Sequence, residues 1–336
     1  MPFLQLFQCT QGGLSSCLHL TFVPTSGYRT YLLDNYQQAH QLPLKSKRIH
    51  SRLSGSFIST FKGRGMEFDE ARPYQPGDDI RSIDWRVTAR SGKTHTKLYR
   101  EERERPVLIW VDLRKPMFFA SQGMFKSVLA AKAAALLAWS STQHNDRLGG
   151  LIFSEEQHTE LRPQRGKSAT LHFLQQLAKH TAWFTNNGNK NNVAKSAIEN
   201  QSADHALNRL RRVAKPGSLI FLISDFRNMN DHKNANIESS LAQMAKHNDL
   251  VMLFINDPLE QQLPPSGLYK ITDGQNEMTI NTHNPTLRSK YQQRFATHQQ
   301  YLKDLCVKLG IFYINISTDK PLLESLQKGL NLRTKF

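Results

Sequence analysis

Val107-Leu108-Ile109-Trp110-Val111-Asp112 is the stretch that decides the fold, because five apolar residues in a row end at a carboxylate. An apolar run of this length predicts a β-strand that is buried on both faces. The Ala-rich segment that follows, Met124 to Gln143, predicts a long helix whose inward side carries Phe125, Val128, Leu129, Leu136 and Leu137. The order of strand, loop and helix is the first unit of an α/β fold.

The same alternation continues toward the C-terminus. Further apolar strands are predicted at 149–153, 219–223, 250–255 and 311–316, and amphipathic helices at 168–180, 203–214, 237–246 and 320–330. The polar segment 185–201 predicts a surface loop or a disordered insertion. Apolar strands that alternate with amphipathic helices predict a parallel sheet with helices on both faces.

Upstream of residue 106 the pattern changes. Residues 28–42 predict a helix, and the region from Leu53 to Arg105 predicts a small, mostly β module that mixes charges, aromatics and turn residues. We expect its Asp and Arg side chains to pair around buried Tyr74 and Trp85. Its central stretches are Gly63-Arg64-Gly65-Met66-Glu67-Phe68, Arg72-Pro73-Tyr74-Gln75-Pro76-Gly77-Asp78-Asp79-Ile80-Arg81, Ile83-Asp84-Trp85-Arg86 and Ala89-Arg90.

Composition narrows the class of protein. The chain has 336 residues, 39% of them hydrophobic, which is enough for a substantial core. Its 44 Lys and Arg residues against 28 Asp and Glu give a net charge of +16, so the surface should attract acidic partners. The three cysteines, Cys9, Cys17 and Cys306, favour a reducing cytoplasm over a disulfide framework or a zinc site. No segment is apolar and long enough to predict a membrane span.

The central stretches of the upstream module resemble the signature of domain of unknown function family 58, whose members carry a von Willebrand factor A-like domain directly after it. Asp257-Pro258-Leu259-Glu260 and Leu263-Pro264-Pro265-Ser266-Gly267 also resemble the family, so the resemblance covers about residues 53–330. It implies a von Willebrand factor A-like (Rossmann-like) domain at 107–336, after a helix and signature module at 28–106. Residues 1–27 match no part of the family, and we expect either a disordered leader or a start-codon artefact.

The resemblance also implies where a divalent metal would bind. Such domains hold the metal through an Asp-x-Ser-x-Ser loop after the first strand, a Thr and a later Asp. In this chain Arg114 and Pro116 replace the two serines after Asp112, the Thr position falls near Ser202, and Asp225 is the later Asp. Neither Arg nor Pro offers a side-chain oxygen ligand, so a degenerate site without metal is expected.

Two arrangements of this degenerate site remain open. In one, the Arg114 guanidinium takes the place of the metal and pairs with both Asp112 and Asp225, which leaves a metal-independent recognition edge. In the other, Arg114 points into solvent and the two carboxylates merely cap adjacent helices.

The signature itself also allows two interpretations. Its charges can form a hydrogen-bond network that holds a small β unit with little core. Alternatively, part of the signature faces outward as a docking surface with aromatic anchors. The residues proposed for partner binding are Tyr74, Asp78, Asp79, Arg81, Asp84, Trp85, Arg86 and Arg90.

The resemblance implies a non-enzymatic adaptor that acts with a MoxR-type AAA+ ATPase in complex assembly or stress response. The sequence shows no nucleophile, metal-ligand or phosphate-loop motif and no cofactor motif. Two alternatives remain: a nucleic-acid-binding protein that uses its basic surplus, and an enzyme of unrecognised type.

Overall fold

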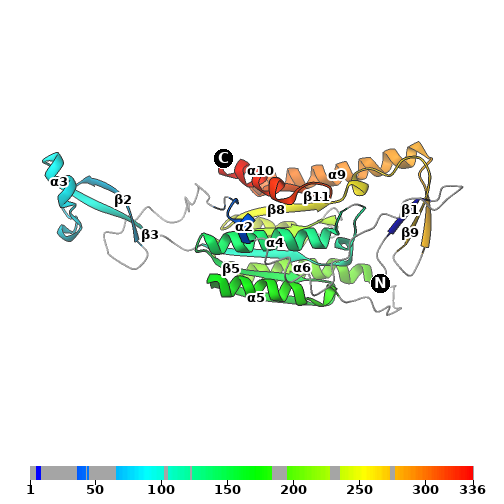
Figure 1. Cartoon of the computed structure of the whole chain (residues 1–336), viewed down its shortest axis with the longest axis horizontal. Helices are drawn as coiled ribbons and strands as arrows, with labels where there is room; N and C mark the ends of the chain where they lie inside the picture. Colours follow the sequence, from blue (N-terminus) through cyan, green and yellow to red (C-terminus); the bar gives the residue numbers. More distant parts are fainter. Residues whose placement is uncertain are drawn as a thin grey trace. The chain divides into compact units, whose positions relative to one another are not determined.

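The structure is a computed structural model that describes residues 5–8, 36–42, 44, 66–101, 105–121, 123–183, 195–227, 235–272 and 277–335. The chain divides into two compact units (Figure 1). The larger unit comprises Met1–Lys47 and Pro106–Phe336, and the smaller unit comprises Arg48–Arg105. Each unit is described by itself.

A six-stranded, mostly parallel sheet forms the centre of the larger unit, in the order β11-β8-β7-β4-β5-β6. Only β6 runs antiparallel to its neighbour. The predicted strands are all present, as β4 (Pro106–Asp112), β5 (Arg147–Phe153), β7 (Leu219–Ser224), β8 (Asp249–Asn256) and β11 (Phe312–Ser317).

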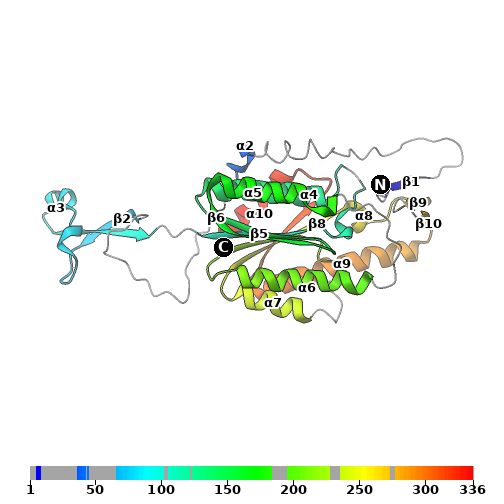
Figure 2. The same ribbon diagram turned by 90° about the horizontal axis from the view of Figure 1, so that it is seen from below.

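Helices cover both faces of this sheet, as Figure 2 shows from its edge. Alternate residues of β4 point to opposite faces. Val107, Ile109 and Val111 pack in one core cluster with α4 (Lys126–Gln143), α5 (Gly166–Lys179) and α10 (Leu322–Lys335). Leu108 and Trp110 pack in the other with α6 (Lys195–Val213), α7 (Ala235–Ala245) and α9 (Pro285–Leu309). The mixed α/β architecture with two helical layers is therefore as predicted.

Several elements of the larger unit were not predicted, among them β6 and α9. The edge strand β6 (His158–Arg165) is largely exposed, so it has no apolar run to mark it. Helix α9 is 25 residues long, but its buried residues are only Leu302, Leu305 and Cys306, near its C-terminal end. Its polar first half explains why no hydrophobic period predicted it. Helix α6 begins at Lys195, so the expected loop at 185–201 is wrong over its last residues.

The described N-terminal residues, 5–8, 36–42 and 44, belong to the larger unit. Residues 5–8 form β1 (Gln5–Gln8), which pairs with β9 (Leu268–Thr272), and β9 also pairs with β10 (Glu277–Asn281). The helix predicted at 28–42 is described only as α2 (Tyr36–Ala39), and Ala39 and Leu42 are buried in the core beside α4. The remainder of the expected leader lies outside the described residues.

The smaller unit is a hairpin with a helix in its connection. Strands β2 (Met66–Pro73) and β3 (His95–Glu101) pair antiparallel, and the segment between them contains the 3-10 helix η1 (Ile80–Ser82) and α3 (Trp85–Ser91). The helix was missed because its seven residues are too few to show a period, and none of them is buried. Gly92 ends α3 with a φ of 68°, a backbone conformation that favours glycine.

Candidate functional site

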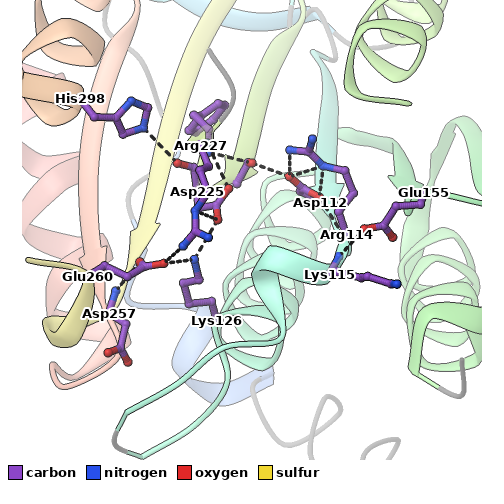
Figure 3. Close-up of polar contacts among 12 residues, drawn as sticks. Asp112, Arg114, Lys115, Lys126, Glu155, Asp225, Arg227, Asp257, Glu260 and His298 are labelled. Atoms are coloured by element: carbon purple, nitrogen blue, oxygen red, sulfur yellow. Dashed lines mark hydrogen bonds and ion pairs between the residues drawn. The ribbon is translucent and has the colours of Figure 1, made fainter. Parts of the chain in front are cut away.

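The carboxyl edge of the central sheet brings together the two aspartates that the sequence singled out. Asp112 is the last residue of β4 and Asp225 follows β7, and these two strands are parallel neighbours. Asp112 is fully buried, and Asp225 is 3% exposed. Two buried carboxylates need compensating charge or hydrogen bonds, which Figure 3 shows in detail.

Arg114 supplies that charge to Asp112. Its Nε lies 2.9 Å and 3.1 Å from the two carboxylate oxygens, and its Nη2 lies 2.6 Å from Oδ2. The Arg114 backbone N–H and the Ser224 hydroxyl donate to the same carboxylate at 2.9 Å and 2.6 Å. Burial alone would lower the pKa of Arg114, but the charge and hydrogen bonds of Asp112 raise it instead. Arg114 is buried, so it does not point into solvent.

Asp225 has a different partner from the one expected. The ammonium of Lys126, in the first turn of α4, lies 2.8 Å from Asp225 Oδ2 and 2.7 Å from Glu260 Oε1. The structure gives no ion pair between Arg114 and Asp225; Arg227 donates to Glu260 and lies 3.8 Å from Asp225. Burial would raise the pKa of Asp225, but the nearby cations, Lys126 foremost, hold it well below its usual range.

Asp257 and Glu260 complete the cluster through a capping box at α8 (Pro258–Gln261). Asp257 accepts the Leu259 N–H at 2.9 Å, and Glu260 accepts the Asp257 N–H at 3.1 Å. Asp257 also accepts the Ser121 N–H at 2.9 Å and the Thr318 hydroxyl at 2.6 Å. The spacing of Asp257 and Glu260 in Asp-Pro-Leu-Glu matches a capping box, so the sequence alone could have placed both residues at the start of a helix.

The side chains present at this edge do not fit a divalent cation. A cation held by Asp112 and Asp225 would lie beside the Arg114 guanidinium and the Lys126 ammonium, which already use those oxygens. Pro116 lies half-buried in the 3-10 helix η2 (Lys115–Met117) and offers no side-chain ligand. Ser202 lies in α6, and its side chain falls outside what the structure describes. The described residues contain no group of three His, Cys, Asp or Glu side chains placed to share a metal.

In the smaller unit, three aspartates shape the backbone. Asp84 caps α3 by accepting the N–H groups of Arg86 at 3.0 Å and Val87 at 3.3 Å. Asp79 accepts the Arg81 N–H at 3.0 Å at the start of η1. Asp78 accepts the Gln75 N–H at 2.9 Å and the Arg72 guanidinium at 2.7 Å, and these bonds lower its pKa. These carboxylates therefore act on local structure.

The expected pairing of these aspartates with the other signature arginines is wrong. Among the described residues, the side chains of Arg81, Arg86 and Arg90 make no ion pair, and all three are exposed. Trp85 is 69% exposed rather than buried, and Ile80 is 68% exposed. Tyr74 is half-buried, and its N–H donates to the Thr94 carbonyl at 2.8 Å. The aspartates face the backbone, while the arginines and Trp85 face solvent.

No helix in the described ranges combines the length and the apolar character that a bilayer crossing needs.

Comparisons with known proteins find curated relatives, a solved structure and a family model. Uncharacterized protein Mb1516 of Mycobacterium bovis and uncharacterized protein Rv1480 of Mycobacterium tuberculosis are each 25% identical to this chain over 299 residues, with 88% of each chain covered. The crystal structure of conserved hypothetical protein BatB from Bacteroides thetaiotaomicron matches 69% of this chain and all of its own, at 14% identity and a TM-score of 0.40. The family model described as protein of unknown function DUF58 matches residues 70–301. Since that match spans more than half of the sequence, this chain belongs to the DUF58 family of proteins of unknown function.

Proposed function

We propose that this protein is a non-enzymatic adaptor that binds a protein partner through the exposed face of its smaller unit, and that the partner is a MoxR-type AAA+ ATPase. The exposure of Trp85, at 69%, is the observation that carries the proposal. A tryptophan in solvent contributes nothing to the core of the unit, whereas Trp and Arg dominate the binding energy of protein interfaces. The partner's identity rests on the family resemblance alone.

The surroundings of Trp85 support an interface anchor. Asp84 fixes the start of α3, so the helix that carries Trp85 is ordered without contributing a buried residue. Arg81, Arg86 and Arg90 lie in the same stretch of chain with no acidic partner among the described residues. An aromatic group flanked by free guanidinium groups complements an acidic, partly apolar protein surface.

We also propose that the larger unit is a von Willebrand factor A-like domain whose metal site is degenerate. Asp112 and Asp225 lie at the carboxyl edge of a parallel sheet, where open α/β folds bind ligands. The guanidinium of Arg114 and the ammonium of Lys126 neutralise these carboxylates from within the chain. The edge would then keep its shape with no divalent cation, and the adaptor would work in the presence of chelators.

A capture experiment tests the adaptor. The purified full chain is immobilised and incubated with the MoxR-type ATPase of the same organism, with and without ATP. Trp85→Ala should weaken capture about thirtyfold, as expected for loss of an interface anchor worth about 2 kcal/mol. Asp84 is left in place, because its removal would uncap and destabilise α3. A loss of capture could then come from misfolding rather than from a lost contact.

Val307→Ala is the matched control, since Val307 is also exposed, at 83%, but lies on α9 of the larger unit. It should leave capture unchanged. Equal capture by wild type and a folded Trp85→Ala variant, or no capture under any nucleotide condition, would reject the docking role of this face.

Two observations support the alternative of nucleic-acid binding. The three exposed arginines have no ion-pair partner in the described part of the chain, and the net charge is +16. Both features favour contact with phosphates. Affinity that falls steeply with salt concentration would distinguish this alternative from the adaptor.

A further inference from the structure

A cavity of about 290 Å³ lies in the larger unit beside the charged cluster at the sheet edge. Its volume is at the small end of the range of about 300–1,000 Å³ typical of ligand pockets, so it suits a compact ligand. The walls are mostly apolar and include Phe118, Phe119, Leu259, Leu263, Pro264 and Ile280. These residues come from the segment after β4, from α8 and the loop that follows it, and from β10.

Most polar groups in the wall are already satisfied by the protein. The Tyr291 hydroxyl donates to the Leu259 carbonyl at 3.1 Å, and the Thr282 hydroxyl lies 2.8 Å from the Pro265 carbonyl. Glu260 also lines the cavity, but its carboxylate accepts from Lys126 and Arg227. Its negative charge is therefore compensated.

Arg227 is the polar group that remains able to bind a ligand. Its side chain is 52% exposed and lines the cavity. Its Nη2 donates to Glu260 and its Nε lies 3.8 Å from Asp225, whereas its Nη1 has no hydrogen-bond partner among the described residues (Figure 3). Burial would lower the pKa of Arg227, but Asp225 and Glu260 raise it, so the guanidinium stays charged.

Lys115 also lines the cavity, but its ammonium points away from Arg227 (Figure 3). Its side chain is exposed, and its backbone N–H donates to Glu155 at 2.6 Å. The cavity thus combines an apolar interior with one compensated carboxylate and one guanidinium that keeps an available N–H donor. Its chemical complement is an apolar group attached to an anion.

We propose that this cavity binds a compact ligand that joins an apolar group to a carboxylate, with the apolar group among Phe118, Phe119 and Leu263 and the carboxylate on Arg227. A free aromatic or aliphatic acid and the C-terminal residue of a polypeptide share this chemistry. The site goes beyond the proposed adaptor function, because the docking face lies in the smaller unit and no residue of that unit lines the cavity.

Isothermal titration calorimetry of the full chain with N-acetylphenylalanine and N-acetylphenylalaninamide tests the proposal. The two probes have the same apolar group, but only the first has a carboxylate. The acid should bind at least tenfold more tightly than the amide, because a charge-assisted bond to a guanidinium is lost with the carboxylate. Equal binding of both probes, or no binding of the acid at millimolar concentration, would overturn the proposal.

Three variants locate the binding. Arg227→Gln should weaken binding of the acid about tenfold, and Leu263→Trp should abolish it by filling the cavity. Lys303→Gln is the matched control, since Lys303 is exposed on α9 and does not line the cavity. If Arg227→Gln fails to fold, Leu263→Trp still decides, because that loop residue is not among the buried core side chains. Unchanged binding by folded Leu263→Trp would place the ligand elsewhere and reject the site.

The source of the ligand follows from two further probes. Tighter binding of a peptide that ends in Phe than of 3-phenylpropionate would assign a polypeptide C-terminus, and the reverse would assign a free acid; either result supports the site. Trp85→Ala should bind all probes normally. Loss of ATPase capture and loss of ligand binding therefore report on separate residues, so either proposal can fail without the other.

Discussion

Lys126 is the residue whose environment departs furthest from that of an ordinary surface lysine. Its side chain is fully buried, although lysine is almost never fully buried unless it is paired. The Lys126 ammonium lies 2.8 Å from Asp225 and 2.7 Å from Glu260. Removing the lysine would therefore take a compensating positive charge away from both carboxylates. An ion pair at such a position is costly to form and more costly to break.

The first prediction follows from this burial. Lys126→Met should lower the free energy of unfolding by about 3–5 kcal/mol, measured by chemical denaturation, because it breaks a buried ion pair from one side. Adding Asp225→Asn should recover part of that loss, giving a coupling energy of about 1 kcal/mol or more. Lys179→Met on the exposed end of α5 is the control and should change stability by less than about 0.5 kcal/mol. A Lys126→Met variant as stable as wild type would contradict the paired geometry.

At the scale of elements, the apolar runs predicted the five strands β4, β5, β7, β8 and β11, because strands buried on both faces need continuous apolar sequence. They also predicted that Asp112 and Asp225 would lie close together, since parallel strands end at the same edge of the sheet.

The partner of Asp225 could not be predicted, because Lys126 approaches from α4, 99 positions away in sequence. Sequence spacing carries no information about such a contact. Trp85 was also misplaced: composition predicts burial for an aromatic residue, but Trp85 lies on a short helix that has no buried residue.

The second prediction concerns the sheet edge as a unit. Replacing Arg114 and Pro116 by serine restores the Asp-x-Ser-x-Ser pattern, and the sequence alone predicts a gain of Mg²⁺ affinity. The structure predicts no gain, because the Lys126 ammonium still lies 2.8 Å from Asp225 Oδ2 and would repel the metal. Calorimetric titration with Mg²⁺ measures the outcome.

The control for this prediction is a third substitution on the same background. Arg114→Ser/Pro116→Ser/Lys126→Gln removes both buried cations, so Asp112 and Asp225 become available to a hard cation that prefers oxygen ligands. Binding by this variant but not by the double variant would assign the block to Lys126. Millimolar Mg²⁺ binding by the double variant would show that Lys126 does not occupy the site.

At the scale of the whole molecule, the distribution of the positive charge matters more than its sum of +16. The larger unit uses several cations internally, with Arg114, Lys126 and Arg227 all bound to carboxylates at the sheet edge. The smaller unit instead leaves Arg81, Arg86 and Arg90 exposed, with no ion pair to any described residue. Contact with polyanions should therefore concentrate on the smaller unit.

The third prediction uses salt to separate contact with phosphates from capture of a protein partner. Affinity for single- or double-stranded DNA, measured by fluorescence anisotropy, should fall steeply with salt, because the binding comes from counterion release. Replacing Arg81, Arg86 and Arg90 by Gln should reduce the slope of log affinity against log salt by about one for each lost phosphate contact. The control replaces Lys290, Arg294 and Lys303, exposed residues of α9, by Gln. It removes the same charge and should change the slope little.

Capture of the ATPase should persist at salt concentrations that abolish DNA binding, since Trp85 contributes apolar area rather than charge. Tight DNA binding that survives high salt and depends on Trp85 would instead indicate base stacking on this tryptophan, and would make nucleic acid the partner of the smaller unit.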